Sequence, residues 1–175
     1  MSKQLKEFRD AANKVSKLKA AGYTIKQLKA VRFTPEALKT GGFTAFELRA
    51  AGYTPKQLKN AGFTPQDLRA AGYTARDLRD IRLTLKQLRD LGFTPKESYD
   101  SGFTTYQLKA CGYTAKEFRK AGYLVSDLRE AGFKYKDILA AGYTLKQLID
   151  GGYPEQELID VGYRLKELYD EARNS

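Results

Sequence analysis

The sequence predicts an all-α fold, a right- or left-handed α-solenoid with one short capped helix in every ten-residue repeat. The first observation behind this prediction is that a ten-residue pattern recurs fifteen times between residues 22 and 171 without insertion or deletion. The second is that each repeat carries residues typical of a helix start and a helix end. The third is that such helices are too short to be stable alone, so stacked neighbours must stabilise them.

The start of each predicted helix is a glycine, an aromatic residue and a threonine. Glycine opens thirteen of the fifteen repeats, Tyr or Phe follows in fourteen, and Thr follows in eleven. Thr is a favourable N-cap because its hydroxyl accepts a hydrogen bond from a backbone N–H that has no partner within the helix. Three residues after the Thr position stands Glu, Gln or Asp in every repeat except the one with Ala37, which predicts a capping box.

The end of each predicted helix is the glycine of the next repeat. Glycine adopts the left-handed conformation of a helix C-terminus at little steric cost. Arg32 and Arg82 replace it in two repeats. Each is predicted to adopt that conformation at a cost of about 1 kcal/mol or more, unless the turn differs there.

The predicted core consists of three columns of the repeat. They are the aromatic residue, the Leu found four residues after the Thr position in twelve repeats, and the small residue before each glycine. Cys111 belongs to the small-residue column, which is typical of a buried structural thiol.

The two ends of the chain depart from the repeat, as terminal capping elements do. Residues 1–21 have the apolar spacing of an N-terminal capping helix, residues 22–171 are the repeats, and 172–175 form a polar C-terminal tail that follows a C-terminal capping helix. No linker interrupts the sequence, which therefore predicts a single repeat domain over residues 1–175.

The composition argues against catalysis. The absence of His excludes a His-based triad and the usual imidazole metal site, and one Cys cannot form a thiolate cluster. We therefore predict a non-enzymatic protein without cofactor, metal or small-molecule substrate. No apolar run reaches the length of a membrane span and no secretory signal follows Met1, which predicts a cytoplasmic protein without a membrane partner.

The column after the Leu is basic in ten of the eleven repeats from residue 29 to residue 129. Residues 1–131 carry 25 basic and 13 acidic side chains, whereas residues 132–175 carry 6 and 8. A basic stripe suits a nucleic acid or another polyanion, and Phe46, Tyr99 and Tyr106 could stack on its bases. The alternative is a solvated face whose cations complement helix C-termini. The candidate polyanion-binding residues are Lys29, Lys39, Arg49, Lys59, Arg69, Arg79, Arg89, Lys109, Arg119 and Arg129.

The same column becomes apolar near the C-terminus, at Leu139, Ile149, Ile159 and Tyr169. If the column is exposed, these residues form an apolar ladder typical of a protein interface, most simply one for self-association. The alternative is local packing against the C-terminal capping helix.

The pattern Ala-Gly-aromatic-Thr-x-x-x-Leu-basic, seen in residues 61–69 and 71–79, resembles that of short-helix decapeptide-repeat solenoids over about 150 of the 175 residues. The resemblance implies a scaffold that mediates protein–protein interactions, here with possible self-association through the C-terminal repeats. The alternative functions are nucleic-acid or polyanion binding through the basic column, and a structural role in a filament.

Overall fold

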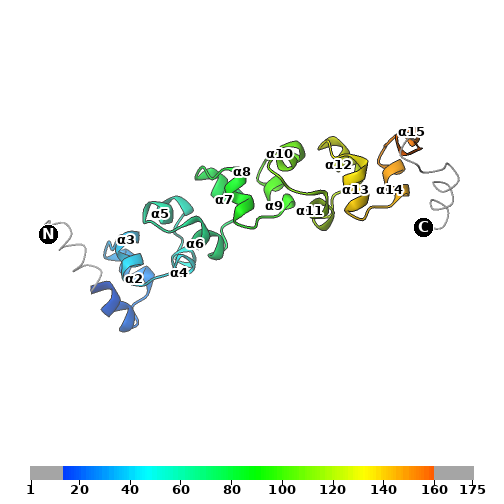
Figure 1. The fold of residues 1–175 in the computed structure, drawn as a ribbon. Helices are drawn as coiled ribbons and strands as arrows, with labels where there is room; N and C mark the ends of the chain where they lie inside the picture. The colour runs from blue at the N-terminus through cyan, green and yellow to red at the C-terminus, as the bar shows by residue number, and fades with distance from the viewer. Residues whose placement is uncertain (1–13, 160–175) are drawn as a thin grey trace. The chain divides into compact units, whose positions relative to one another are not determined.

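The structure is a computed structural model that describes residues 14–159 of the chain. A helix over residues 14–20 is followed by fourteen short helices, and the described part contains no strand (Figure 1). The prediction of an all-α repeat solenoid with one helix in each repeat is thereby confirmed for the fourteen repeats that the structure describes. Residues 1–13 of the predicted N-terminal capping helix, the C-terminal capping helix and the 172–175 tail lie outside the described residues.

The chain forms two compact units, residues 1–83 and 84–175. The boundary lies beside Arg82 and Leu83, which replace the usual Gly and aromatic residue, and the ten-residue register continues across it. In the first unit the helix over residues 14–20 is followed by α2 (Ile25–Ala30), α3 (Pro35–Thr40), α4 (Ala45–Ala50), α5 (Pro55–Asn60), α6 (Pro65–Ala70) and α7 (Ala75–Asp80). The described helices of the second unit are α8 (Leu85–Asp90), α9 (Pro95–Asp100), α10 (Thr105–Ala110), α11 (Ala115–Lys120), α12 (Val125–Glu130), α13 (Tyr135–Ala140), α14 (Leu145–Asp150) and α15 (Glu155–Ile159).

The predicted capping boxes begin most of these helices. At α4 the Thr44 N–H donates to Glu47 Oε2 at 2.7 Å, and the Glu47 N–H donates to Thr44 Oγ1 at 3.2 Å. Complete boxes with a Thr hydroxyl occur at α2, α4 to α11 and α14. The box with Asp67 closes at 2.8 Å, so the shorter acid closes it as well as Glu does. As predicted, the helix with Ala37 has only the Thr34 half of the box.

The helix ends are Schellman turns. After α4, the Gly52 N–H donates to Arg49 O at 2.8 Å and the Tyr53 N–H donates to Leu48 O at 3.1 Å. Gly52 has a φ of 80°, and Arg32 and Arg82 adopt the same left-handed region with φ values of 64° and 68°. The prediction for the two arginines is therefore confirmed.

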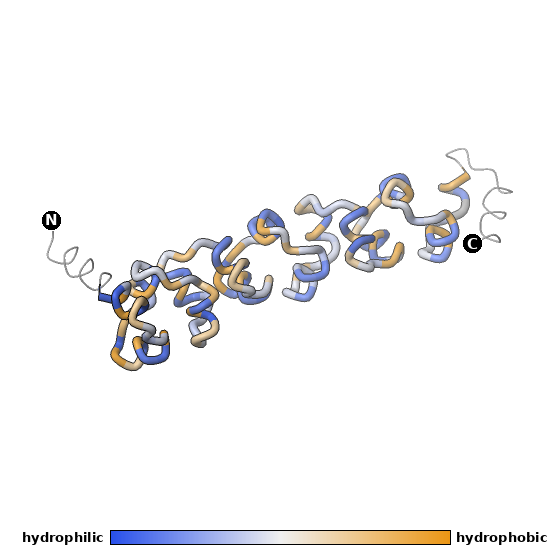
Figure 2. Tube along the Cα trace, turned by 90° about the horizontal axis from the view of Figure 1, so that it is seen from below, coloured by the Kyte–Doolittle hydropathy of each residue, from blue (hydrophilic) through white to orange (hydrophobic). Residues whose placement is uncertain are grey.

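Within each unit, helices pack on the next helix and on the one after it. In the first unit α3 packs on α5 and α4 on α6, while in the second α9 packs on α11 and α10 on α12. Even-numbered helices therefore stack on even-numbered ones and odd on odd, and α10 and α12 lie along the opposite edge from α9, α11 and α13 (Figure 1). Hydrophobic and hydrophilic segments alternate at short intervals along the trace because every repeat contributes to this core (Figure 2).

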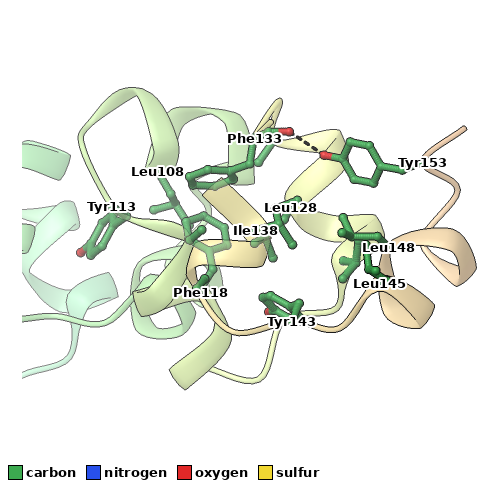
Figure 3. Packing of buried hydrophobic residues seen from close by; sticks show 14 of the residues in the cluster. Leu108, Tyr113, Phe118, Leu128, Phe133, Ile138, Tyr143, Leu145, Leu148 and Tyr153 are labelled. Carbon is green, nitrogen blue, oxygen red and sulfur yellow. Dashed lines mark hydrogen bonds between the residues drawn. The ribbon is translucent and has the colours of Figure 1, made fainter. Parts of the chain in front are cut away.

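The core follows the predicted Leu and aromatic columns. Leu48, Leu58 and Leu128 are fully buried. In the second unit Phe118 replaces Leu, and its ring centroid lies 5.2 Å from that of Phe133 (Figure 3). The Phe118 centroid also lies 4.9 Å from that of Tyr123. A residue of the Leu column therefore packs on the aromatic residues of the two repeats that follow it.

At two positions the small-residue column is matched in size to a valine on the helix two before it in the chain. A Cβ added to Gly41 would lie 2.2 Å from Val15 Cγ1, and one added to Gly151 would lie 2.5 Å from Val125 Cγ1. In both pairs the glycine ends the second helix after the one that carries the valine, so one packing rule operates in both compact units. Cys111 of the same column is only half-buried, which is less than predicted.

The column positions that break the pattern have local solutions. Ser98, where Leu is usual, is fully buried, and its Oγ lies 3.0 Å from Tyr113 Oη. The Tyr113 hydroxyl also donates to Phe93 O at 2.6 Å. The polar side chain is thus satisfied inside the core, as buried polar groups require.

Among residues 14–159, no helix combines the length and the apolar character that crossing a membrane requires.

Candidate interaction surface

The basic column reaches forward by two repeats and contacts the C-terminal turn of the helix stacked there. Arg49 Nη1 donates to Ala71 O at 2.9 Å, and the guanidinium lies 5.2 Å from the ring centroid of Tyr73. Gly72 lies between these contacts, and a Cβ added to it would be 2.6 Å from Arg49 Nη1. The cation therefore donates a hydrogen bond to a carbonyl at a helix C-terminus and also makes a cation–π contact with an aromatic ring.

This arrangement recurs throughout the described chain. The cation lies over the aromatic ring that follows the second helix after its own, with distances to the centroid between 4.3 and 5.8 Å. The pairs are Lys19–Phe43, Lys29–Tyr53, Lys39–Phe63, Arg49–Tyr73, Arg89–Tyr113, Lys109–Phe133, Arg119–Tyr143 and Arg129–Tyr153. Each links two stacked helices within one compact unit.

Carbonyl acceptors accompany many of these pairs. Arg89 and Arg119 donate to Cys111 O and Ala141 O at 3.2 and 3.1 Å. Lys39 and Lys109 donate to the carbonyls of the glycines at positions 62 and 132. Several predicted polyanion-binding residues thus have partners inside the array, a role that the sequence analysis missed.

Exceptions in the columns support the same interpretation. Leu83 replaces the aromatic residue two repeats ahead of Lys59, and Lys59 keeps the hydrogen bond to Ile81 O at 2.7 Å. Tyr99, which replaces the basic residue, makes an edge contact with Tyr123 at 6.1 Å between centroids. The position therefore contacts the same aromatic column whether or not it is charged. Arg69 and Arg79 occupy the same place in the last turns of α6 and α7.

The predicted base-stacking residues divide into two kinds. Phe46 and Tyr106 are 64% and 68% exposed, so their rings are available at the surface. Tyr99 is 47% exposed, but its ring is engaged with Tyr123. Phe46 lies on α4 of the first unit, whereas Tyr99 and Tyr106 lie on α9 and α10 of the second.

The predicted C-terminal apolar ladder lies at the edge of the core. Leu139, Ile149 and Ile159 are half-buried and pack against the hydrophobic cluster of the second unit. Their contact is with the repeats themselves, and the predicted alternative, packing against the C-terminal capping helix, concerns residues outside the described range. Tyr169 lies outside the described residues.

Three surface pockets in the second unit are the same pocket formed at different repeats. Each lies between the N-terminal turn of one helix and the helix stacked two further on. The α9/α11 pocket, of about 240 Å³, is lined by Thr94, Pro95, Lys96, Tyr113, Glu117, Lys120 and Ala121, among others. A shift of two repeats gives the α11/α13 pocket of about 440 Å³, lined by Thr114, Ala115, Lys116, Phe133, Asp137, Ala140 and Ala141, among others. A shift of three repeats gives the α12/α14 pocket of about 240 Å³, lined by Leu124, Val125, Ser126, Tyr143, Gln147, Asp150 and Gly151.

The pockets share an apolar floor and differ at the rim. An aromatic ring and a small residue recur in all three, while the exposed rim positions vary from Lys96 and Lys116 to Ser126. Hydrogen bonds hold two rings of the floor, because Tyr113 and Tyr143 each donate at 2.6 Å to a carbonyl two repeats earlier. Burial accordingly raises the pKa of both phenols above their ordinary value, and Ser98 and Arg119 oppose that rise.

The electrostatics of the capping boxes are structural. A hydrogen bond from the Thr64 backbone N–H, followed by one from its hydroxyl, lowers the pKa of Asp67 below its usual value. For Glu47, burial raises the pKa, but hydrogen bonds from Thr44 and Lys19 outweigh burial and the net shift is downward. These acids are ionised near neutral pH and stabilise helix N-termini. Their geometry is that of caps throughout the boxes described.

The comparisons with known proteins agree with the repeat architecture. No curated protein and no solved structure matches the chain significantly. The family described as decapeptide repeat region matches three overlapping segments, residues 3–65, 42–115 and 102–172. These segments together span nearly the whole sequence and include both compact units. The chain therefore belongs to the decapeptide repeat family.

Proposed function

We propose that the protein is a non-enzymatic scaffold that binds a protein partner along its repeated surface. The observation that carries the proposal is the recurrence of one pocket at shifts of two and three repeats. A constant floor with a variable rim can accept a linear partner segment by segment, because each pocket adds an independent contact.

The pockets have the composition of peptide-binding sites. Their floors combine an aromatic ring with Pro95, Ala115 or Val125, and their rims carry exposed polar side chains. Concave apolar sites with a few polar groups are typical of ligand recognition. The aromatic floor is already held by hydrogen bonds before a partner arrives, which lowers the entropic cost of binding.

The test is a selection from a random peptide display library on the full chain. Ala140→Trp fills the rim of the α11/α13 pocket from an exposed position. Lys134→Trp is the matched control, because Lys134 is exposed and lines none of the three pockets. We expect selected peptides to bind the wild-type chain and the control and to lose affinity for Ala140→Trp. Failure to select any peptide, or equal binding to all three proteins, would overturn the proposal.

Polyanion binding is the second candidate, and the charge of residues 1–131 favours it. That segment has 25 basic and 13 acidic side chains. The exposed lysines at positions 26, 56, 86 and 116 could add to the basic column in contacting phosphates. Fluorescence anisotropy with labelled single-stranded and duplex nucleic acids at several salt concentrations tests this candidate. Tight binding with steep salt dependence would support it, and absence of binding at low salt would remove it.

Self-association or filament formation through the C-terminal repeats is a further form of the scaffold proposal. Light scattering as a function of concentration measures it directly. If Ile149 contributes to a contact between copies, Ile149→Lys should dissociate the assembly while circular dichroism retains the helical signal. An assembly that survives this substitution would assign the contact elsewhere.

A further inference from the structure

We infer that the α9/α11 and α11/α13 pockets recognise an extended peptide with an acidic side chain at every third residue. The inference rests on the proposed function, because it names the partner of the same surface. It depends on the charge of the two rims, on the shared wall between the pockets and on the spacing that helix stacking imposes.

The charge comes from lysines that face the two pockets. Lys96 and Lys120 line the α9/α11 pocket, and Lys116 lines the α11/α13 pocket. All three are exposed. Lys96 contacts Asp100 at 2.5 Å, but both side chains of this pair are more than half exposed. Such surface pairs contribute little and exchange partners readily, so Lys96 remains able to meet a ligand carboxylate.

The acids beside these lysines do not cancel them. Glu117 lines the α9/α11 pocket, but its Oε2 accepts hydrogen bonds from the Thr114 N–H and hydroxyl at 2.7 and 2.8 Å. Its charge is therefore directed at the start of α11. Asp137 opposes Lys116 in the α11/α13 pocket, where Lys109 is a second cation. Both pockets keep an excess of basic groups.

The spacing follows from the way the pockets are built. Tyr113 lines both, and α11 lies between them as a shared wall. The two pockets are therefore one stacking step apart, which is about 8–10 Å for packed helices. An extended or polyproline II peptide advances by about 9–10 Å in three residues. Acidic residues at every third position would then meet successive pockets, with apolar residues between them lying against the aromatic floor.

The same features favour a peptide over a nucleic acid. Each duplex strand has a phosphate about every 3.4 Å, which is much denser than the pocket spacing. The rings of Phe93, Tyr113 and Phe133 are buried, so they can contact small apolar side chains at the floor but offer no open face for a base. The cationic groups of Arg89 and Lys109 also lie over the rings of Tyr113 and Phe133.

The α12/α14 pocket provides an internal contrast. It has the same floor, but Ser126 and Asp150 replace the rim lysines, and no cation lines it. An acidic ligand should therefore avoid it. A partner that discriminates between the pockets would bind the odd-numbered stack of helices in this unit.

The experiment measures fluorescence anisotropy of labelled peptides with the full chain. The probe is a peptide of four Glu-Leu-Pro units, and two controls have the same composition with the Glu residues clustered, or Lys in place of Glu. We expect the periodic acidic peptide to bind, with weaker binding of the clustered peptide and none of the basic one. Lys96→Gln and Lys116→Gln should each weaken binding by about two- to fivefold, whereas Lys134→Gln should leave it unchanged.

The outcomes separate this inference from the proposed function. If display-selected peptides bind the pockets but the Glu-Leu-Pro peptide does not, the acidic register is wrong and the scaffold proposal stands. If neither the display-selected peptides nor the Glu-Leu-Pro peptide binds, both this inference and the scaffold proposal are wrong. Equal affinity for the periodic and clustered peptides would reduce the interaction to nonspecific charge and overturn the inference. Displacement of the peptide by a single-stranded oligonucleotide at equal charge concentration would assign the pockets to nucleic acid, with the same consequence.

Discussion

Val125 and Gly151 are in contact because Gly151 has no side chain. A Cβ on Gly151 would lie 2.5 Å from Val125 Cγ1 and 2.7 Å from Val125 Cβ, which no packed structure tolerates. Gly151 has a φ of −78°, so the contact, and not the backbone conformation, requires the glycine. The pair joins the start of α12 to the end of α14.

The first prediction concerns this pair. Gly151→Ala should lower the free energy of unfolding by about 1–3 kcal/mol, because overpacking forces the two stacked helices apart. Adding Val125→Ala should restore stability, since Ala45–Ala71 and Ala115–Ala141 already occupy the same register. A double-mutant cycle by urea denaturation measures the coupling. Additive effects of the two substitutions would contradict the size-matching rule.

The second prediction concerns the cation on the helix end. Arg49→Met keeps much of the side-chain stem but removes the hydrogen bond to Ala71 O and the contact with the Tyr73 ring. We expect it to destabilise the chain by about 1–2 kcal/mol, while Arg49→Lys loses much less because Lys29 and Lys39 make the same ring contact elsewhere. Thermal unfolding followed by circular dichroism compares the variants. If Met and Lys behave alike, the charge has no role in stacking.

The third prediction separates two demands on the glycine column. Gly52 and Gly72 both have left-handed backbones, with φ values of 80° and 88°, but only Gly72 has a guanidinium against it. Gly52→Ala should cost about 1–2 kcal/mol from backbone strain alone. Gly72→Ala should cost more, because Arg49 must also move. In an Arg49→Ala background the difference between the two glycine variants should vanish, and its persistence would point to another cause.

The fourth prediction follows from the phenol of Tyr123. Burial, with Asp100, Tyr99 and Asp127 nearby, raises its pKa to about 12. Between the ordinary Tyr value of about 10 and 12, the unfolded chain loses this proton while the folded chain keeps it. The unfolding free energy should therefore fall as pH rises through this window and be fully present below it.

Alkaline unfolding titrations of the wild-type chain and Tyr123→Phe check the effect. The loss of stability between these pH values should be smaller in the variant, with the remainder due to other buried phenols such as Tyr113. Tyr99→Arg should place a cation at the ring and lower the Tyr123 pKa, as ultraviolet absorbance of tyrosinate can measure. If Tyr123→Phe loses as much stability as the wild-type chain over this pH range, and Tyr99→Arg leaves the Tyr123 pKa unchanged, the raised pKa of Tyr123 would be contradicted.

Local features of the fold could be predicted from the sequence, because caps and turns depend on residues within one repeat. Thr44 with Glu47, and Arg82 at a left-handed position, needed no knowledge of neighbours. The contacts between repeats could not be predicted in the same way. In a regular array, every basic residue is followed by an aromatic residue in each of the next three repeats. Local chemistry does not indicate which of the three it contacts.

Irregular positions contained the missing information. Val15 and Val125 are the valines of the position after the Thr column, and Gly41 and Gly151 are the glycines of the small-residue column. Both glycines follow a valine at the same offset, which identifies stacking two repeats ahead. The basic column was interpreted as a ligand-facing stripe because its contacts with carbonyls and aromatic rings two repeats ahead become visible only once this offset is known. The pockets escaped prediction for the same reason, since their walls come from two stacked helices.

The fixed offset between partners also constrains how such a gene can change length. Recombination between copies of the coding repeat removes or adds whole ten-residue segments, which preserves every cap and turn. Loss of one segment between Val125 and Gly151 would instead place Val161 at the sequence offset from Val125 that Gly151 now has, where a Cβ would lie 2.5 Å from Val125 Cγ1. Size-matched pairs thus constrain the number of repeats between their two residues. Segments whose stacked positions are alanines can gain or lose a repeat without this constraint.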